Sequence, residues 1–245
     1  MRLDKKIAIV TGAGSGFGAG IARKFAAEGA HVILADINGA AAEAVAREIG
    51  GTAQQCNVAD RASVEALRDA ALAIGPVDII VNNAGVTHLP NPTETVTEAD
   101  FDRIFAVNMK AIYLMTQAFV PGLKAQRAGN ILNIASTAGV SPRPNLSWYN
   151  ASKGWVITAT RSLAVELAPF GIRVNALNPV AGETPLLKSF MGQDTPEIRA
   201  KFLSTIPLGR FSTPEDMGNA ACFLCSDEAS MVTGVCMAVD GGRCI

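Results

Sequence analysis

Short apolar runs alternate along the chain with longer amphipathic segments. Most runs keep apolar residues at successive positions, which is typical of parallel strands buried on both faces of a sheet. Clear strands are expected over residues 6–11, 31–37, 77–84, 130–136, 172–178 and 235–240, and a weaker strand over 52–58.

The segments between these runs, such as residues 18–30, 40–50 and 64–75, have the apolar period of helices. Alternating β and α units favour a parallel sheet with helices on both faces. No linker, repeat or change of composition divides the chain. We therefore expect an α/β fold: one doubly wound domain over residues 1–245 with a seven-stranded parallel sheet.

Residues 181–216 interrupt the alternation between the sixth and seventh expected strands. This segment contains Pro185, Pro196, Pro207 and Pro214. Long excursions in compact domains are usually lids or binding loops. We expect an insertion that covers the substrate, and the alternative is a helical insertion that only packs.

The charges of the chain are nearly balanced, with 21 Lys and Arg against 22 Asp and Glu. This balance disfavours a nucleic-acid or membrane partner and favours a small molecule. The N-terminal residues lack the apolar core and cleavage site of a signal peptide, and no stretch reaches the ~18 apolar residues of a membrane span. We expect a cytoplasmic protein.

The chain has an odd number of cysteines at uneven spacing, which fits reduced thiols better than a disulfide framework. Cys222 and Cys225 have the spacing of a metal or redox pair. They lie in an apolar helical pattern without a second pair, and His31 and His88 are the only histidines. We expect buried thiols and no metal site.

A glycine-rich stretch, TGAGSGFG at residues 11–18, joins the first strand to the first helix. Gly12, Gly16 and Gly18 would let the backbone approach a pyrophosphate, which the N-terminus of the helix attracts. The spacing G-x-x-x-G-x-G differs from the usual G-x-G-x-x-G. No lysine follows the glycines, so a nucleoside-triphosphate P-loop is disfavoured.

Asp36 ends the second expected strand. A carboxylate there can accept hydrogen bonds from the adenosine ribose hydroxyls and would repel the 2′-phosphate of NADP. No arginine follows within Ile37, Asn38 and Gly39, so the sequence predicts NAD as cofactor. Asp36 could also cap the next helix, which is compatible with this role.

Tyr149 and Lys153 lie four residues apart in NLSWYNASKGW. On a helix they share a face, with Cβ atoms ~5–6 Å apart. A nearby positive charge lowers the pKa of a phenol, which would make Tyr149 a proton-transfer group. In the alternative, Lys153 is a solvated surface charge and Tyr149 an ordinary half-buried aromatic residue.

Four motifs together resemble the signature set of the classical short-chain dehydrogenase/reductase family. They are TGAGSGFG, NNAG at residues 82–85, Ser136 with Tyr149-x-x-x-Lys153, and VDGG at residues 239–242, and they follow in the family's order along essentially the whole chain. The resemblance implies a Rossmann-type domain, a nicotinamide cofactor and commonly a homotetramer.

By position, the resemblance implies the catalytic residues Asn108, Ser136, Tyr149 and Lys153. Tyr149 would exchange a proton with the substrate oxygen, and Ser136 would hold that oxygen in line with the nicotinamide. Lys153 would hold the nicotinamide ribose and lower the pKa of Tyr149. Asn108 would steady a water that links Lys153 to solvent.

The glycine-rich turn, Asp36 and the resemblance together give the expected cofactor-binding residues. They are Gly12, Ser15, Gly16, Phe17, Gly18, Asp36, Ile37, Asn57, Val58, Asn83, Ala84, Gly85, Tyr149, Lys153, Pro179, Gly182 and Thr184.

The chain departs from the family's pattern at three positions near the expected cofactor site. Asn57 stands where an aspartate beside the adenine is common, and its side-chain oxygen can still accept a hydrogen bond. Val180 replaces the glycine of the usual Pro-Gly turn, while Gly182 follows two positions later. Phe17 replaces a smaller aliphatic residue and could crowd the cofactor phosphates.

The expected activity is NAD(H)-dependent interconversion of a secondary alcohol and a ketone. The expected pocket walls are mainly apolar, which favours a largely uncharged substrate, although Arg143 leaves room for a carboxylate. These walls are residues 87–91 and 138–148 with Leu186, Leu187, Phe190 and Met191, and the possible polar anchors are His88, Arg143 and Asn145.

Two other functions are considered. A 3-oxoacyl-[acyl-carrier-protein] reductase would tend to use NADPH and to dock an acidic carrier protein on basic residues. Asp36 disfavours NADPH, and only Arg127 and Arg173 lie in the corresponding segments. The complete set of four catalytic positions argues against a dinucleotide-sensing protein without turnover.

Overall fold

Seven parallel strands form one sheet in the order β3-β2-β1-β4-β5-β6-β7, in a computed structural model that describes residues 1–245. The strand order reverses between β1 and β4, which creates a crevice at the carboxyl ends of the strands where α/β proteins bind ligands. The expected seven-stranded doubly wound sheet is confirmed. The strands are β1 (Ile7–Thr11), β2 (His31–Asp36), β3 (Thr52–Gln55), β4 (Ile79–Asn82), β5 (Gly129–Ile134), β6 (Ile172–Pro179) and β7 (Cys236–Val239).

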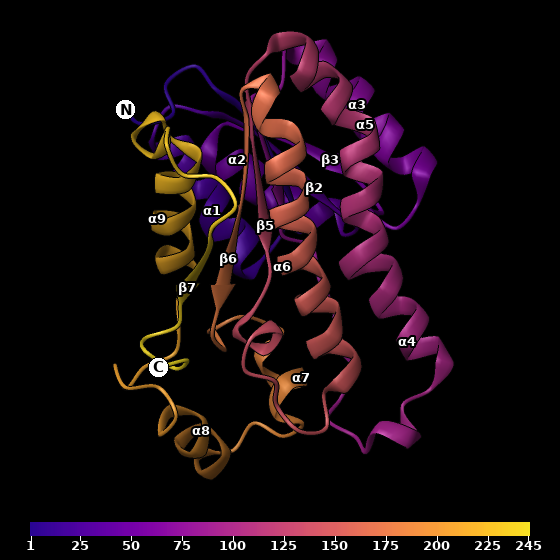
Figure 1. Ribbon diagram of the computed structural model, residues 1–245, viewed down its shortest axis with the longest axis vertical. Coiled ribbons are helices and arrows are strands. Elements are labelled where there is room, and N and C mark those ends of the chain that lie inside the picture. The colour runs from indigo at the N-terminus through magenta and orange to yellow at the C-terminus, as the bar shows by residue number, and fades with distance from the viewer.

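Helices cover both faces of this sheet (Figure 1). One face carries α1 (Gly16–Ala27), α2 (Gly39–Ile49) and α9 (Pro214–Cys225). The opposite face carries α3 (Arg61–Ile74), α5 (Ala111–Gln126) and α6 (Ser147–Leu167), with α4 (Glu98–Ile104) preceding α5. Beyond the carboxyl ends of the strands lie α7 (Leu187–Met191) and α8 (Pro196–Leu203) (Figure 1).

Short helical turns complete the secondary structure. A π-helical segment joins α4 to α5, and single 3₁₀ turns follow or precede several of the main elements. Their bounds are Phe105–Lys110 for the π segment and Thr93–Thr95, Thr137–Gly139, Ala168–Phe170 and Asp227–Ala229 for the 3₁₀ turns.

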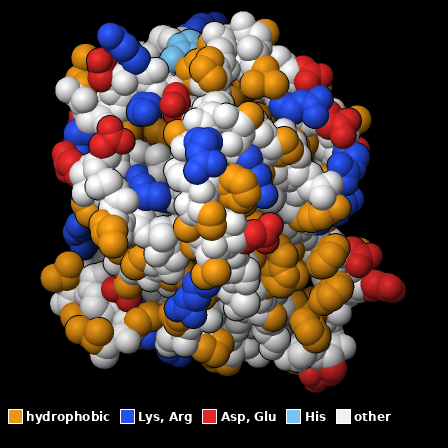
Figure 2. All heavy atoms as spheres, turned by 45° about the horizontal axis from the view of Figure 1, so that its top comes forward, with side chains coloured by type: hydrophobic (Ala, Val, Ile, Leu, Met, Phe, Trp, Pro, Cys, Tyr) orange, Lys and Arg blue, Asp and Glu red, His pale blue; other side chains and the backbone are white.

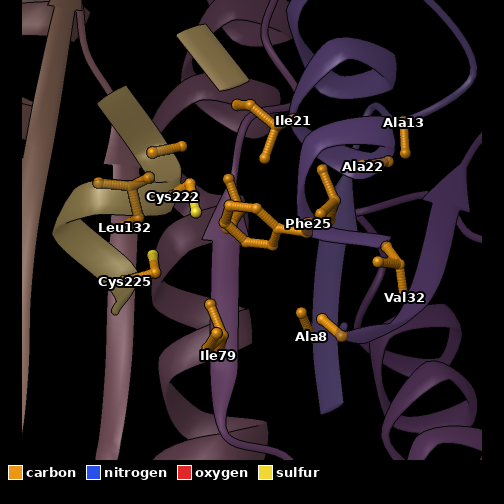
Figure 3. Packing of buried hydrophobic residues seen from close by; sticks show 14 of the residues in the cluster. Ala8, Ala13, Ile21, Ala22, Phe25, Val32, Ile79, Leu132, Cys222 and Cys225 are labelled. Carbon is orange, nitrogen blue, oxygen red and sulfur yellow. The ribbon is translucent and has the colours of Figure 1, made fainter. Parts of the chain in front are cut away.

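The strands are buried on both faces, as their continuous apolar pattern predicts. In β1, Ala8 and Val10 pack toward α1 and α9, while Ile9 packs toward the opposite helices. Figure 3 shows Phe25 of α1 within this first core, together with Cys222 and Cys225 of α9.

All five cysteines are free thiols, and those at 222 and 225 are fully buried in this core. Burial raises the pKa of Cys225 to about 12, so its thiol stays protonated and unreactive. The expectation of buried thiols at these two positions is therefore confirmed.

The surface mixes charges of both signs. On the face shown in Figure 2, Lys and Arg side chains are separated by acidic, apolar and uncharged ones, and no continuous basic patch appears. No helix is both long enough and apolar enough to cross a membrane.

Several strands are shorter than the sequence predicts, because the chain leaves the sheet where the crevice begins. Expected strand 77–84 ends at Asn82, and expected strand 52–58 ends at Gln55. The residues that follow these ends face the crevice instead of extending the sheet.

The segment over residues 181–216 contains α7 and α8 and packs around its own apolar cluster. That cluster consists of Val180, Leu187, Met191, Ile206 and Phe211. The segment is therefore a packed helical insertion, and it also lines the crevice through residues such as Gly182 and Leu186.

Candidate functional site

A cavity of about 720 Å³ lies along the carboxyl ends of the strands, within the size range of small-molecule sites. Nearly all of the expected cofactor-binding and catalytic residues line it. These are Gly12, Ser15, Gly16, Phe17, Asp36, Ile37, Asn57, Val58, Asn83, Ala84, Gly85, Ser136, Tyr149, Lys153, Pro179, Gly182 and Thr184. Gly18 and Asn108 are not part of the lining and support it from behind.

The glycine-rich turn is held in place by the side chain of Asn83. Its Nδ2 donates to Thr11 O at 2.8 Å and to Gly12 O at 3.1 Å. Gly12 has φ +64°, which favours glycine. A Cβ at Gly18 would lie 2.1 Å from Gly12 O, so Gly18 is required for close packing of α1 against the turn.

The N-terminus of α1 offers donors for an anion. Ser15 is the N-cap, and its side chain makes no capping hydrogen bond. The first turn contains no acidic residue, and Gly16 and Phe17 line the cavity. Free backbone N–H groups and the helix dipole make this end suited to the pyrophosphate of a dinucleotide.

Asp36 reaches the cavity from the end of β2. Its Oδ2 accepts a hydrogen bond from Gly14 N at 2.9 Å and its Oδ1 accepts one from Asn38 N at 2.9 Å. The N-cap of α2 is Asn38, whose side chain accepts from Ala41 N. Asp36 therefore does not cap the next helix, and its carboxylate keeps lone pairs for a ribose hydroxyl.

Phe17 packs against Gly182, which explains two departures from the family's pattern together. A Cβ at Gly182 would lie 2.2 Å from Cζ of Phe17, so only glycine leaves room for the ring. Val180 is buried in the insertion's own cluster. The chain thus lacks the family's glycine at position 180 but has Gly182, which leaves room for the larger Phe17.

Tyr149 lies in the first turn of α6 with 6% of its surface exposed, and its ring contacts Phe190 edge-on, with centroids 5.0 Å apart. Burial raises its pKa to about 12, while hydrogen bonding to Ser136 and the charge of Arg143 oppose this rise. Lys153 is not among the groups that act on this pKa, and the expected lowering by Lys153 stays a prediction.

The reason lies in where the ammonium group points. Nζ of Lys153 donates to Ile134 O at 2.8 Å and lies 5.9 Å from the centroid of the Tyr149 ring. Lys153 is only 5% exposed, and burial lowers its pKa to about 8. It is therefore no solvated surface charge, and the cavity holds a buried amine beside a buried phenol.

Asn108 lies in the π-helical segment, a distortion that is frequent at functional sites. Its Oδ1 accepts from Val86 N at 2.8 Å, and its Nδ2 donates to Val86 O at 2.9 Å and to Ser152 Oγ at 3.0 Å. Ser152 in turn donates to Tyr149 O at 2.7 Å. Asn108 thereby braces the start of α6, and its role in holding a water remains a prediction.

The structure revises the expected substrate walls. The expected wall residues that do line the cavity are Ala138, Arg143, Leu146, Leu186 and Phe190. Leu187 and Met191 are instead buried in the insertion's own cluster. Neither residues 87–91 nor Asn145 belong to the lining, and His88 Nδ1 is 2.7 Å from Leu89 O.

Among the lining residues that sequence reasoning missed are Arg103, Ala106, Val107 and Phe202. The first three lie near the π segment, which no residue pattern announces. Phe202 lies in α8 and reaches the cavity only because the insertion folds back over the sheet edge. No group of three or more His, Cys, Asp or Glu residues could hold a metal ion.

Comparisons with known proteins cover nearly the whole chain. The family model described as Enoyl-(Acyl carrier protein) reductase matches residues 12–243. A 4-formylbenzenesulfonate dehydrogenase of Comamonas testosteroni is 49% identical over 99% of both chains. A 7alpha-hydroxysteroid dehydrogenase of Escherichia coli is 40% identical over 99% of this chain and 95% of its own.

A solved structure is similarly close. The 3-ketoacyl-(acyl-carrier-protein) reductase of Brucella melitensis, complexed with NADH, has a TM-score of 0.95 and 52% identity. The match covers 99% of this chain and 100% of that one.

Proposed function

Because the chain belongs to the classical short-chain dehydrogenase/reductase family and is an oxidoreductase of alcohols and ketones, we propose that it uses NAD(H) and Tyr149 to interconvert a secondary alcohol and a ketone. The observation that carries this proposal is the convergence of Ser136, Tyr149 and Lys153 on one cavity with the glycine-rich turn and Asp36. A nicotinamide cofactor supplies the chemistry of hydride acceptance or donation when it is bound.

The residues of the cavity fit such a cofactor. The N-terminus of α1 would hold its pyrophosphate, Asp36 its adenosine ribose, and Lys153 its nicotinamide ribose. Lys153 is buried without an acidic partner. Within the protein its ammonium group donates only to Ile134 O, so the ribose hydroxyl groups would accept its remaining hydrogen bonds.

Proton transfer is assigned to Tyr149. Its hydroxyl would donate a proton to the carbonyl oxygen during reduction and accept it back during oxidation, while Ser136 donates a hydrogen bond to the same oxygen. Apolar lining residues such as Leu146, Leu186 and Phe190 would help to exclude water from this reaction.

Reaction with a panel of secondary alcohols tests the proposed activity. We expect NAD⁺ to be reduced with at least one of them. We expect no reduction with matched tertiary alcohols, because they have no hydrogen on the carbinol carbon to transfer as hydride. Tight NAD(H) binding without any turnover across the panel would instead support a dinucleotide-sensing protein.

The cofactor preference depends on Asp36. We expect kcat/KM with NAD(H) to exceed that with NADP(H) at least about tenfold, on the order of 1.4 kcal/mol, because the carboxylate repels a 2′-phosphate. Asp36→Ala should narrow this ratio without abolishing turnover, and Asp69→Ala on the exposed face of α3 is the matched control. Equal kcat/KM values for the wild-type protein would refute the assignment.

The alternative, a 3-oxoacyl-[acyl-carrier-protein] reductase, is supported by the similarity to the Brucella enzyme. However, the guanidinium of Arg173 donates to the carbonyls of Leu224, Val232 and Ser226, and burial lowers its pKa. Arg127 also bonds a carbonyl, Pro169 O at 3.2 Å. The guanidinium of Arg173 is therefore engaged within the fold and not available to an acidic carrier protein. This disfavours the reductase relative to the proposed main function.

We also propose a homotetramer and a cytoplasmic location. Ile245 is fully exposed in a single chain and Met231 before β7 is 97% exposed, so apolar side chains near β7 are available for self-association. Light scattering should give the tetramer mass, and a monomer at micromolar concentration would contradict it.

The proposed cytoplasmic location is supported by the five free thiols, which fit a reducing compartment.

A further inference from the structure

Four charged residues line the cavity, and three of them are already engaged. Asp36 accepts two backbone hydrogen bonds, and Lys153 donates to Ile134 O. Arg103 donates to Asp100 Oδ1 at 2.9 Å and to Thr87 O at 3.1 Å. Arg143 is the exception, because its guanidinium forms no ion pair and no hydrogen bond within the protein.

The guanidinium of Arg143 is positioned all the same. Its Cζ lies 4.2 Å from the centroid of the Phe202 ring, so the side chain stacks on α8 of the insertion. Arg143 precedes α6 and contacts α8, so it lines the part of the cavity beside the insertion, whereas Asp36 lines it from the end of β2.

A second unpartnered cation lies nearby. Arg243, in the segment after β7, has a fully buried Nε without a hydrogen-bond partner. Burial lowers the pKa of Arg143, and the charge of Arg243 lowers it further. Arg243 does not line the cavity, but its uncompensated charge adds to that of Arg143, which does. An anion bound at Arg143 would accept its free hydrogen bonds and relieve the repulsion between the two guanidinium groups.

We propose that Arg143 binds a carboxylate or sulfonate group of the substrate, with the charge of Arg243 adding to the attraction, so that the enzyme prefers secondary alcohols and ketones carrying such a group beyond an apolar body. This inference rests on the proposed function, since it names the substrate class of the same site. A planar guanidinium binds both oxyanion types through paired hydrogen bonds. The aromatic rings of Phe190 and Phe202 would contact the apolar body between that group and Tyr149.

A matched pair of substrates tests the proposal: para-(1-hydroxyethyl)benzoate and its neutral counterpart para-(1-hydroxyethyl)benzamide, both with NAD⁺. We expect wild-type kcat/KM to favour the benzoate at least about tenfold. In Arg143→Gln this ratio should fall to about one, mainly through a higher KM for the benzoate, and Arg143→Lys should keep an intermediate ratio. Arg47→Gln, which removes an exposed arginine of α2, is the control for loss of charge.

The outcomes separate the inference from the function. Turnover of both alcohols without a preference, or a preference that survives in Arg143→Gln, would overturn the anion site and leave the dehydrogenase intact. Turnover of neither alcohol, nor of any other secondary alcohol, would overturn the proposed function itself. Measurable turnover of the benzamide by Arg143→Gln shows that the variant is folded.

Discussion

Tyr149→Phe is expected to lower kcat by at least ~10²–10⁴-fold, the usual contribution of a general acid or base, while the Kd for NADH stays within about twofold. The phenylalanine ring keeps the edge contact with Phe190 and the burial of α6, so only the exchangeable proton is lost. Stopped-flow turnover and fluorescence titration with NADH measure the two quantities.

The chain offers a matched control, because Tyr113 is its only other tyrosine. Tyr113 lies on α5 with 48% of its surface exposed, and Tyr113→Phe should leave both quantities unchanged. Wild-type turnover in Tyr149→Phe would show that another group handles the proton, and the mechanism would have to be abandoned.

Lys153→Met is expected to abolish turnover and yet raise the melting temperature. Lowering the pKa of this amine from 10.5 to about 8 corresponds to a cost of about 3 kcal/mol for burying its charge at neutral pH. The methionine avoids this cost but leaves Ile134 O without its donor, a loss of ~1–2 kcal/mol. The net gain of about 1–2 kcal/mol should raise Tm by roughly 2–8 °C.

The pH dependence of this gain has a defined sign. Below pH 8 the lysine is charged in both states, and its buried charge destabilises the fold in full. Between pH 8 and 10.5 the unfolded chain binds the proton that the folded protein has released, so wild-type stability from this group rises with pH.

The Tm advantage of Lys153→Met should therefore shrink across this window, as scanning calorimetry at several pH values can measure. Lys201→Met removes an exposed lysine and should show no such change. A Tm advantage that stays constant from pH 7 to about 10 would mean that the amine is not a buried charge.

Most of the sheet could be predicted from the sequence because strands buried on both faces leave a continuous apolar signal. The glycine-rich turn and the Tyr149–Lys153 spacing were equally informative, since each is a local pattern of residue types. Strand ends were less predictable: Asn83 and Ala84 continue the β-like pattern of β4 but are diverted toward Thr11, whose hydroxyl accepts hydrogen bonds from both of their N–H groups.

Features that depend on tertiary contacts could not be predicted. The position of Lys153 on the face shared with Tyr149 is a helical property, but its hydrogen bond to Ile134 O depends on where β5 ends. The pairing of Phe17 with Gly182 joins residues from α1 and the insertion. The stacking of Arg143 on Phe202 joins the segment before α6 with α8. Burial, which decides the pKa of Tyr149, also arises only in the assembled fold.

The central claim is tested most directly by following the carbinol hydrogen of a secondary alcohol. The protein would be incubated with NAD⁺ and 1-phenylethanol or para-(1-hydroxyethyl)benzoate carrying deuterium at the carbinol carbon, and the NADH would be isolated for mass spectrometry. The account predicts NADH that contains one deuterium, together with the matching ketone, and neither product with Tyr149→Phe on the same timescale. Ketone formed with unlabelled NADH, or no reaction with any secondary alcohol tried, would contradict it.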